Sequence, residues 1–526
     1  MGEPIRIRSF VNGRWEEGEG RGTSLLNPAT EELLATASTR GVDMAAALSY
    51  ARKVGGPSLR ELGFAQRASL LKKLSSIMRE HRDELFEIAM RNGGNTRADA
   101  RFDVEGATGA LSFYGGLGAS LGNDNLLPAG DGVALARNAP LWGQHVWTPL
   151  RGAAVLINAY NFPAWGFCEK LACAFLAGMP VVVKPATQTA LLAYRIAEIW
   201  VGSGLLPEGS WTFLAGPAGD LLDHLEAQDV LAFTGSATTA AQLRSHPRVL
   251  AKGVRVNVEA DSLNAAVLGA DAAPGSPTWD LFLRDVAHEM TQKTGQKCTA
   301  TRRIFAPAER VRDVEDALAG RLAAVKVGDP FAEGVSMGPL VSAAQRDGVR
   351  DGIEALARHA RIVFGSPREV TRHDGGDPAV GFFISPVLLR ADDGGAEEIH
   401  RREVFGPAAT LLPYGGAAQE AAGLVGRGEG SLVSTLYSDD PAFLHDALLA
   451  AAPYNGRLAV GSAEVAAEWW SPGAALPALL HGGPGRAGGG EELGGLAGVH
   501  RYMQRTALQG PRALLESVIR GSQPPN

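Results

Sequence analysis

Short apolar segments alternate with longer amphipathic segments along this chain from about residue 151. Ala153–Asn158, Val181–Lys184 and Leu231–Ser236 have the length and composition of buried strands. Pro163–Ala177 and Ala190–Val201, which lie between them, have the apolar spacing of helices. Strands that are apolar on both faces and alternate with helices are typical of a parallel sheet with both faces covered. The sequence therefore predicts an α/β fold.

Three other regions complete the predicted organisation. The alternation restarts after about residue 265 and continues to about residue 480, which predicts a second α/β domain. Near the start, Phe10–Trp15 predicts a hairpin whose tight turn is Asn12-Gly13. Residues 44–121 carry helical periodicity. We therefore expect a long chain with two sheets, preceded by a hairpin and a group of helices.

Charge and cysteine content exclude several classes of protein. The net charge of −7 over 526 residues does not favour a nucleic-acid binder. No run of about 18 apolar residues occurs, so we predict no membrane span. Three cysteines are too few for a disulfide framework, and this favours a reducing cytoplasm.

One cysteine has the surroundings of a nucleophile. Cys298 lies in Met290–Arg303, a glycine-containing segment that is rich in hydroxyl and cationic side chains. Cysteine attacks as its thiolate, which neighbouring positive charge stabilises. Lys297, Arg302 and Arg303 are therefore candidates for favouring the thiolate, and the alternative is that they point to solvent.

The segment around Cys298 resembles the nucleophile segment of the aldehyde dehydrogenase superfamily. Tyr160–Trp165 and Glu403–Pro407 are similar to two further segments of that family, and the likeness extends from near residue 10 to about 510. The resemblance implies that Asn161 donates its amide, together with the Cys298 N–H, to the oxyanion of the reaction. The alternative for Asn161 is an ordinary helix cap.

A candidate general base follows an apolar strand. Glu259 precedes Cys298 at a spacing close to that of the family's base, and a carboxylate there can activate the hydrolytic water. The family usually continues with Leu-Gly-Gly-Lys, whereas this chain has Ala-Asp-Ser-Leu. We assign the base to Glu259, with Asp261 as a weaker competitor.

Three places predict a dinucleotide site. Gly235 and Ser236 end a strand and open a helix, whose N-terminal amides suit a pyrophosphate. Lys184 and Thr187 match the family's segment for the adenosine ribose, where NAD-preferring members often carry Glu at the position of Thr187. A neutral Thr187 does not repel a 2′-phosphate, and Lys184 attracts one. Glu403 matches the residue that binds the nicotinamide ribose. We therefore predict NADP as the cofactor, with NAD as a weaker possibility.

The resemblance also implies an architecture. This is the aldehyde dehydrogenase fold, an α/β fold with two doubly wound domains and a β oligomerisation element. We assign residues 1–127 and 151–264 to the dinucleotide-binding domain, 265–480 to the catalytic domain, and 128–150 and 481–526 to the oligomerisation element. A homodimer is the expected assembly. The alternative is that the C-terminal strand, which includes Tyr502, Met503, Thr506 and Leu508, packs within one subunit.

Finer features point to a substrate class. Asn161–Lys170, Glu259–Asn264 and His481–Gly490 resemble family members that oxidise CoA-linked semialdehydes in aerobic aromatic degradation. The resemblance implies 3,4-dehydroadipyl-CoA semialdehyde, an intermediate of benzoate degradation, as the substrate. The corresponding substrate of phenylacetate degradation, 3-oxo-5,6-dehydrosuberyl-CoA semialdehyde, is the alternative.

Other reaction classes fit the residues less well. An acylating dehydrogenase often lacks the base that Glu259 supplies, and a cofactor-free cysteine thioesterase would leave the ribose and pyrophosphate segments without a purpose. A non-catalytic scaffold would not need Asn161, Glu259, Cys298 and Glu403 together. Because Gln292 stands where a zinc helix beginning at His288 needs its second histidine, we predict no metal site.

Overall fold

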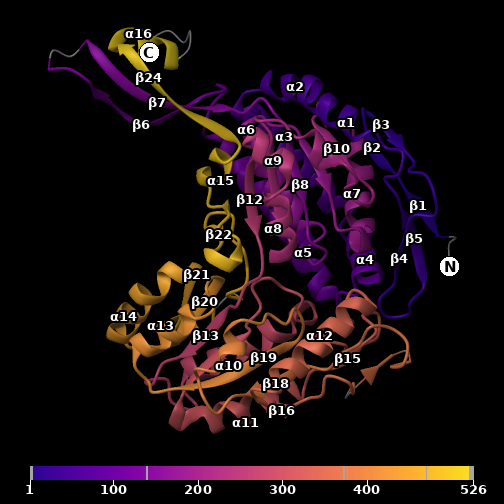
Figure 1. Ribbon diagram of the computed structural model, residues 1–526, viewed down its shortest axis with the longest axis vertical. Helices are drawn as coiled ribbons and strands as arrows, with labels where there is room; N and C mark the ends of the chain where they lie inside the picture. The colour runs from indigo at the N-terminus through magenta and orange to yellow at the C-terminus, as the bar shows by residue number, and fades with distance from the viewer. Residues whose placement is uncertain (1–3, 138–139, 371–372, 376, 469–470, 521–526) are drawn as a thin grey trace.

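The computed structural model describes residues 4–520, except 138–139, 371–372, 376 and 469–470. Two α/β bodies are joined in it, and a narrow three-stranded sheet projects from the upper one (Figure 1). The α/β class and the presence of two large sheets, expected from the strand–helix alternation, are confirmed.

The upper body is built on a seven-stranded sheet with the order β12-β11-β8-β9-β10-β2-β3. Its five strands from β12 to β10 are parallel, and the hairpin of β2 and β3 adds antiparallel at the edge. The strands predicted at 153–158, 181–184 and 231–236 are confirmed within two residues. The strand bounds are β2 (Ser9–Val11), β3 (Arg14–Glu16), β8 (Ala154–Ile157), β9 (Val181–Lys184), β10 (Trp211–Phe213), β11 (Val230–Thr234) and β12 (Arg255–Glu259).

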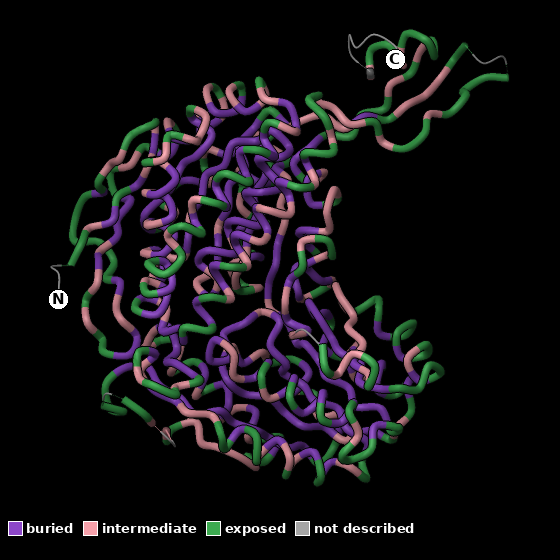
Figure 2. The backbone as a smooth tube through the Cα atoms, turned by 180° about the vertical axis from the view of Figure 1, so that it is seen from behind, coloured by how far each residue is buried: buried purple, intermediate pink, exposed green. Residues whose placement is uncertain are grey.

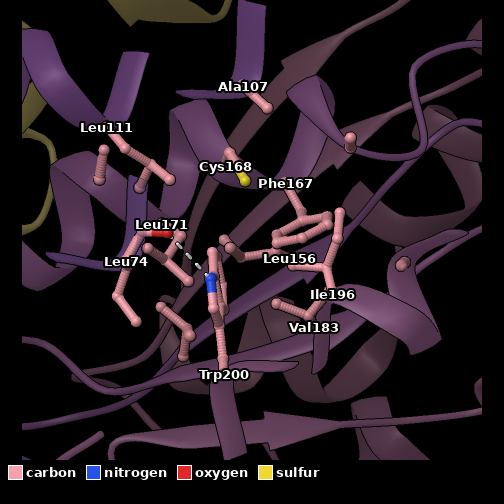
Figure 3. Packing of buried hydrophobic residues seen from close by; sticks show 14 of the residues in the cluster. Leu74, Ala107, Leu111, Leu156, Phe167, Cys168, Leu171, Val183, Ile196 and Trp200 are labelled. Carbon is pink, nitrogen blue, oxygen red and sulfur yellow. Dashed lines mark hydrogen bonds between the residues drawn. The ribbon is translucent and has the colours of Figure 1, made fainter. Parts of the chain in front are cut away.

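Helices cover both faces of this sheet. They are α1 (Met44–Tyr50), the π-helical η1 (Ala51–Gly55), α2 (Gly56–Arg60), α3 (Phe64–Glu80), α4 (Arg82–Gly93), α5 (Arg97–Ala119), α6 (Trp165–Ala177), α7 (Ala190–Gly202), α8 (Ala237–Arg244) and α9 (Pro247–Lys252). Trp200 of α7 shows how they pack: it is fully buried, and its indole N–H donates to the Leu74 carbonyl of α3 at 3.3 Å (Figure 3). Cys168 and Cys173 are both buried in α6 and belong to this hydrophobic core.

The lower body contains the second seven-stranded sheet, with the order β16-β18-β19-β14-β13-β20-β21. All neighbours are parallel except β16, which pairs antiparallel with β18. The strands are β13 (Ala265–Leu268), β14 (Arg303–Pro307), β16 (Arg361–Phe364), β18 (Val387–Arg390), β19 (Ala408–Tyr414), β20 (Ser431–Tyr437) and β21 (Asn455–Gly461). The main helices are α10 (Pro277–Thr291), α11 (Val311–Leu322), α12 (Ala343–Leu356), α13 (Ala418–Gly426) and α14 (Pro441–Ala451).

The projecting sheet is antiparallel and has the order β24-β7-β6. It consists of β6 (Leu127–Ala134), β7 (Leu141–Pro149) and β24 (Met503–Pro511), and α16 (Arg512–Arg520) follows it. Much of its backbone is exposed (Figure 2). The predicted C-terminal strand is confirmed, whereas helix α16 was not expected. The predicted oligomerisation segments also include 138–139 and 521–526, which lie outside the described residues, and their role stays a prediction.

A second hairpin connects the lower body back to the upper one. It is formed by β22 (Leu480–Gly482) and β23 (Glu491–Leu493), and α15 (Leu496–His500) follows. The loop of this hairpin is bonded to the upper sheet, since the Gly490 N–H donates to the Val258 carbonyl at 3.0 Å. The Ala260 N–H donates to the Ala487 carbonyl at the same distance. These two hydrogen bonds place the hairpin, including β22, beside the end of β12.

Smaller elements complete the described chain. A three-stranded sheet joins β1 (Ile5–Ile7), β5 (Leu33–Ala37) and β4 (Thr23–Leu26), and β15 (Val327–Gly328) pairs with β17 (His373–Asp374). None of the helices in the described ranges combines the length and the apolarity needed to cross a membrane.

A sharp turn follows α10 and leads to Cys298. Lys293, Thr294 and Gly295 have φ of 53°, 58° and 66°, so three consecutive residues are left-handed. Such a conformation is costly for residues with a side chain, and it persists only where the surroundings hold it. The Lys293 N–H donates to Asp99 at 3.1 Å, and the Thr294 hydroxyl donates to the Gly338 carbonyl at 2.9 Å.

Gly295 is the position in this turn where a side chain has no room. A Cβ there would lie 2.2 Å from the Gly406 carbonyl oxygen, whereas a Cβ at Gly275, which also has positive φ, would meet nothing within 4 Å. We expect Gly275→Ala to cost ~1–2 kcal/mol through its φ alone. Gly295→Ala should cost ~1–3 kcal/mol more, because backbone must also shift. Thermal unfolding midpoints of the two variants measure the difference, and equal midpoints would contradict it.

Candidate active site

The segment that carries Cys298 is fixed from two sides. Asn264, just before β13, donates its amide to the carbonyls of Cys298 and Ala300 at 2.8 and 2.9 Å. Arg302 donates to the carbonyls of Gly295 and Lys297 at 2.9 and 3.2 Å. The backbone around the cysteine is thus held by side chains that have little freedom to move.

The alternative that the three cations near Cys298 point to solvent is wrong. Lys297 and Arg303 are fully buried, and Arg302 is 4% exposed. Lys297 pairs with Glu289 and donates to Gln292 at 2.6 Å. Arg303 donates to backbone carbonyls, including that of Leu263 at 2.7 Å. The two arginines therefore hold the backbone, and the charge of all three cations is largely used by partners other than the thiol.

The structure brings Asn161, Glu259 and Cys298 together around one cavity. They come from the turn before α6, the end of β12 and the turn after α10. The exposed surface of its lining is largely apolar. The described residues that line it are Phe102, Ala159, Asn161, Phe162, Trp165, Gly166, Glu169, Lys170, Thr234, Glu259, Cys298, Thr299, Gly473, Ala475 and His481. A nucleophile, an amide donor and a carboxylate that share one cavity have the components of acyl chemistry.

The thiol of Cys298 is not activated by its immediate surroundings. Burial raises its pKa well above the usual value, and the charge of Glu259 raises it further. Lys297 acts in the opposite direction but does not overcome these causes. The expectation that a neighbouring cation favours the thiolate is therefore correct in direction for Lys297, although burial and Glu259 keep the pKa of the thiol high. A nearby base that accepts the thiol proton meets the same need.

A histidine that the sequence interpretation did not assign to the site pairs with this base. His481 of β22 places Nε2 3.4 Å from Oε2 of Glu259, and both side chains are at most 5% exposed. Burial by itself raises the pKa of Glu259, but His481 and Lys170 outweigh it and hold that pKa below its usual range. Burial lowers the pKa of His481, and Glu259 more than reverses this effect. Glu259 is thus kept ionised.

Lys170 forms a second buried group of charges behind the base. Its ammonium lies 3.0 Å from Glu169 and 2.8 Å from Glu492 of β23. Burial raises the pKa of Glu492, and Lys170 opposes that rise. Glu169, Lys170 and His481 belong to segments that resembled relatives in the sequence. Nothing in their local pattern, however, indicated that the hairpin of β22 and β23 would place them beside Glu259.

A second cavity meets the first one at the nucleophile. It has about 1310 Å³ of empty space including its open mouth. All five predicted cofactor residues line it: Lys184, Thr187, Gly235, Ser236 and Glu403. Asn161, Glu259 and Cys298 line it too, so an occupant of this cavity reaches Cys298. The residues predicted separately from the sequence therefore converge on two adjoining cavities.

The N-terminus of α8 has the geometry expected for an anion. Ser236 caps it by accepting from the Thr239 N–H at 3.2 Å, and the Ala237 N–H donates to Asp261 at 2.9 Å. Asp261, the weaker candidate for the base, thus lies at the helix N-terminus. A pyrophosphate placed there would compete with Asp261 for this amide.

Glu403 reaches the second cavity from the lower body. One carboxylate oxygen accepts from the Ser262 N–H at 3.2 Å, and the other lies 3.7 Å from Arg302. The latter oxygen is buried and has no hydrogen-bond partner among the described residues. Burial raises the pKa of Glu403 to about 7, with Arg302 acting against that rise. A ribose hydroxyl would supply the missing donor, so the residues present fit a dinucleotide.

Comparisons with known proteins agree with this geometry. The model of the aldehyde dehydrogenase family matches residues 15–508. Over 481 residues the chain is 46% identical to a 3,4-dehydroadipyl-CoA semialdehyde dehydrogenase from Aromatoleum evansii, covering 91% of this chain and 93% of that relative. It is 30% identical to a geranial dehydrogenase from Castellaniella defragrans, covering 82% and 86%. A solved betaine aldehyde dehydrogenase from Staphylococcus aureus in complex with NAD+ superposes with a TM-score of 0.82 at 21% identity, covering 96% and 94%.

The electrostatics of the pair predict how Cys298 reacts. Because Glu259 raises the pKa of the thiol, Glu259→Gln should lower that pKa and increase the thiolate fraction at neutral pH. We expect faster alkylation of Cys298 by iodoacetamide at pH 7, with the pH profile moved to lower pH, as followed by peptide mass spectrometry. Asp261→Asn is the matched control, and it should leave the profile in place. A slower or unchanged reaction of the Glu259 variant would contradict this account.

Proposed function

The chain belongs to the aldehyde dehydrogenase family, and we propose that it oxidises a CoA-linked semialdehyde to the carboxylic acid with NADP+. The proposed substrate is 3,4-dehydroadipyl-CoA semialdehyde, in aerobic benzoate degradation. The observation that carries this proposal is the 46% identity to the Aromatoleum evansii enzyme over nine tenths of both chains. The two adjoining cavities support it, because one suits an aldehyde beside Cys298 and the other suits a dinucleotide.

The proposed reaction begins at the thiol. Glu259 takes the proton of Cys298, and the thiolate attacks the aldehyde carbon to give a thiohemiacetal. The oxyanion that forms accepts hydrogen bonds from the Asn161 amide and the Cys298 N–H. The dinucleotide, when bound, supplies the hydride acceptor. Loss of hydride from the substrate carbon leaves a thioester on Cys298.

Hydrolysis of that thioester completes the cycle. Glu259 accepts a proton from the attacking water, and the thiol leaves as the carboxylic acid forms. His481 supports this step, because its pairing keeps Glu259 ionised before the water is activated. The CoA thioester elsewhere on the substrate stays intact. The reaction is therefore hydrolytic rather than acylating.

The preference for NADP+ rests on two residues of the second cavity. Thr187 is neutral and begins the short helix η2 (Thr187–Thr189), and Lys184 ends β9. Both line the cavity, and Lys184 forms no ion pair with any described residue. A 2′-phosphate would find a cation there and no carboxylate at position 187. NAD+ remains the weaker cofactor in this proposal.

We also propose a homodimer that works in a reducing cytoplasm. The projecting sheet and α16 expose large apolar side chains, including Val133, Leu135, Leu141, Leu514 and Val518. Apolar surface on a projecting sheet favours burial against another subunit. The three free cysteines are consistent with a compartment that keeps thiols reduced.

The substrate is tested by following reduced cofactor with two aldehydes and with NADP+ and NAD+ in parallel. We expect much higher kcat/KM for 3,4-dehydroadipyl-CoA semialdehyde with NADP+ than for a simple aliphatic aldehyde. The product should carry one new carboxylate and one CoA, which excludes acyl transfer to free CoA. Equal efficiency with the simple aldehyde would overturn the substrate assignment. Higher efficiency with 3-oxo-5,6-dehydrosuberyl-CoA semialdehyde would favour the phenylacetate pathway, and acyl-CoA hydrolysis without a cofactor would favour a thioesterase.

The role of Thr187 in cofactor preference is tested by introducing a negative charge at this position. Thr187→Glu places a carboxylate where the 2′-phosphate is proposed to lie, and like charges there repel. We expect kcat/KM with NADP+ to fall by at least about tenfold, or ~1.4 kcal/mol, with a smaller effect for NAD+. Gln is about as large as Glu but carries no charge, so Thr187→Gln should keep the preference for NADP+. Equal losses with both cofactors would remove Thr187 from this role.

A further inference from the structure

Three side chains of the first cavity form a cluster that resembles a metal-ligand set. Glu259 of β12, Cys298 and His481 of β22 each place a donor atom within 4.8 Å of the other two. All three line the same cavity. We propose that Glu259, Cys298 and His481 form a site for a zinc ion, which reversibly blocks the nucleophile when it binds.

The donor types fit zinc closely. Zinc is bound by thiolate, imidazole and carboxylate, and three protein ligands with one open position are a common arrangement for it. Tetrahedral bonds of about 2.0–2.3 Å place ligand atoms roughly 3.3–3.8 Å apart. Nε2 of His481 and Oε2 of Glu259 already lie 3.4 Å apart. The three donor atoms all lie within 4.8 Å of one another, which is close to the spacing that a shared ion needs.

One oxygen in the cluster lacks a partner. Oε1 of Glu259 is buried and accepts no hydrogen bond from any described residue. An unsatisfied buried carboxylate oxygen is costly, and a cation that binds it removes that cost. All three side chains line the same cavity, so a water molecule there can complete the coordination. The site thus has both an unmet acceptor and space for the ion.

The surrounding charges allow a cation. Lys170 acts on Glu259 and opposes a second positive charge, but it is itself paired with Glu169 and Glu492. Lys297 is paired with Glu289. Nearby ammonium groups are therefore offset by carboxylates. On binding, the protons of the thiol and of the imidazole pass to solvent as the zinc–sulfur and zinc–nitrogen bonds form.

Bound zinc would stop the proposed chemistry at its first step. The sulfur lone pair of Cys298 and the carboxylate of Glu259 would both be used in coordination, so neither could act on an aldehyde. Lys184, Thr187 and Glu403 lie in the other cavity and are not ligands. Inhibition should therefore compete with the aldehyde, reverse on chelation and leave dinucleotide binding measurable. This inference adds to the proposed function and does not depend on which aldehyde is oxidised.

The direct test uses Co²⁺ as a spectroscopic probe on the full-length, cofactor-free protein. We expect one Co²⁺ per chain, with the visible bands of tetrahedral cobalt and a sulfur-to-cobalt charge-transfer band that Zn²⁺ displaces. Cys298→Ser should remove the charge-transfer band. His481→Gln should weaken binding by about tenfold or more, since even residues that only support a ligand change affinity by that much. His359→Gln, at an exposed position after α12, is the matched control and should bind normally.

Inhibition provides the second measurement. Zn²⁺ should raise KM for the aldehyde without lowering kcat, EDTA should restore the rate, and Zn²⁺ should protect Cys298 from iodoacetamide. The folding of each variant is checked by its thermal midpoint. If the His481 variant does not fold, Glu259→Gln takes its place as the test. It replaces another proposed ligand and should also weaken Co²⁺ binding. Cobalt without a charge-transfer band, or an affinity equal in His481→Gln and His359→Gln, would overturn the site. Because binding needs no substrate, this failure is distinct from a failure of the proposed function.

Discussion

A single buried guanidinium links the parts of this active site. Arg302 donates to the carbonyls of Gly295 and Lys297 in the nucleophile segment and to that of Gly406 at 2.8 Å. Its Nε lies 3.7 Å from Glu403. The planar, always-charged guanidinium suits this task, since it can hold several fixed acceptors at once. The distance between the cysteine segment and the segment proposed to bind the nicotinamide ribose is thereby set by one side chain.

The charges around Cys298 have opposing effects that the fold must balance. Glu259 raises the pKa of the thiol, which disfavours the thiolate, yet the same carboxylate is the base that we propose for the thiol proton. His481 and Lys170 keep Glu259 ionised in spite of its burial. Because its pKa is low, Glu259 is a weak base. Its nearness to the thiol therefore matters more for proton transfer than its basicity. In the free protein these charges and burial therefore favour the protonated cysteine.

Local patterns in the sequence predicted a large part of this structure. The apolar runs of β8, β9 and β11 indicated buried parallel strands, and Asn12-Gly13 indicated the hairpin turn, because these features depend on neighbours in the sequence. Cys298, Asn161 and Glu259 were predicted from segments with distinctive chemistry. The structure does bring them to one cavity, although their roles remain proposals.

What could not be predicted depends on contacts distant in the sequence. Nothing local shows that Arg302 faces inward, because a charged residue beside a cysteine is as compatible with solvent as with three buried carbonyls. His481 approaches Glu259 only because the loop between β22 and β23 bonds to Val258 and Ala260. Helix α16 was missed as well, although its residues show a helical apolar spacing.

Catalysis and metal binding depend on the same atoms of Cys298 and Glu259, and His481 is the residue at which the two properties differ. A thiol that can become a thiolate, set beside an ionised carboxylate, is good for catalysis and also good for binding a transition metal. Cys298 and Glu259 cannot lose one property without losing the other. His481 touches the base but is not needed to attack the aldehyde or to accept its hydride. In the proposed mechanism His481 acts only through the charge of Glu259, whereas in the proposed zinc site it is itself a ligand, so a relative with a non-ligating side chain there should be far less sensitive to zinc.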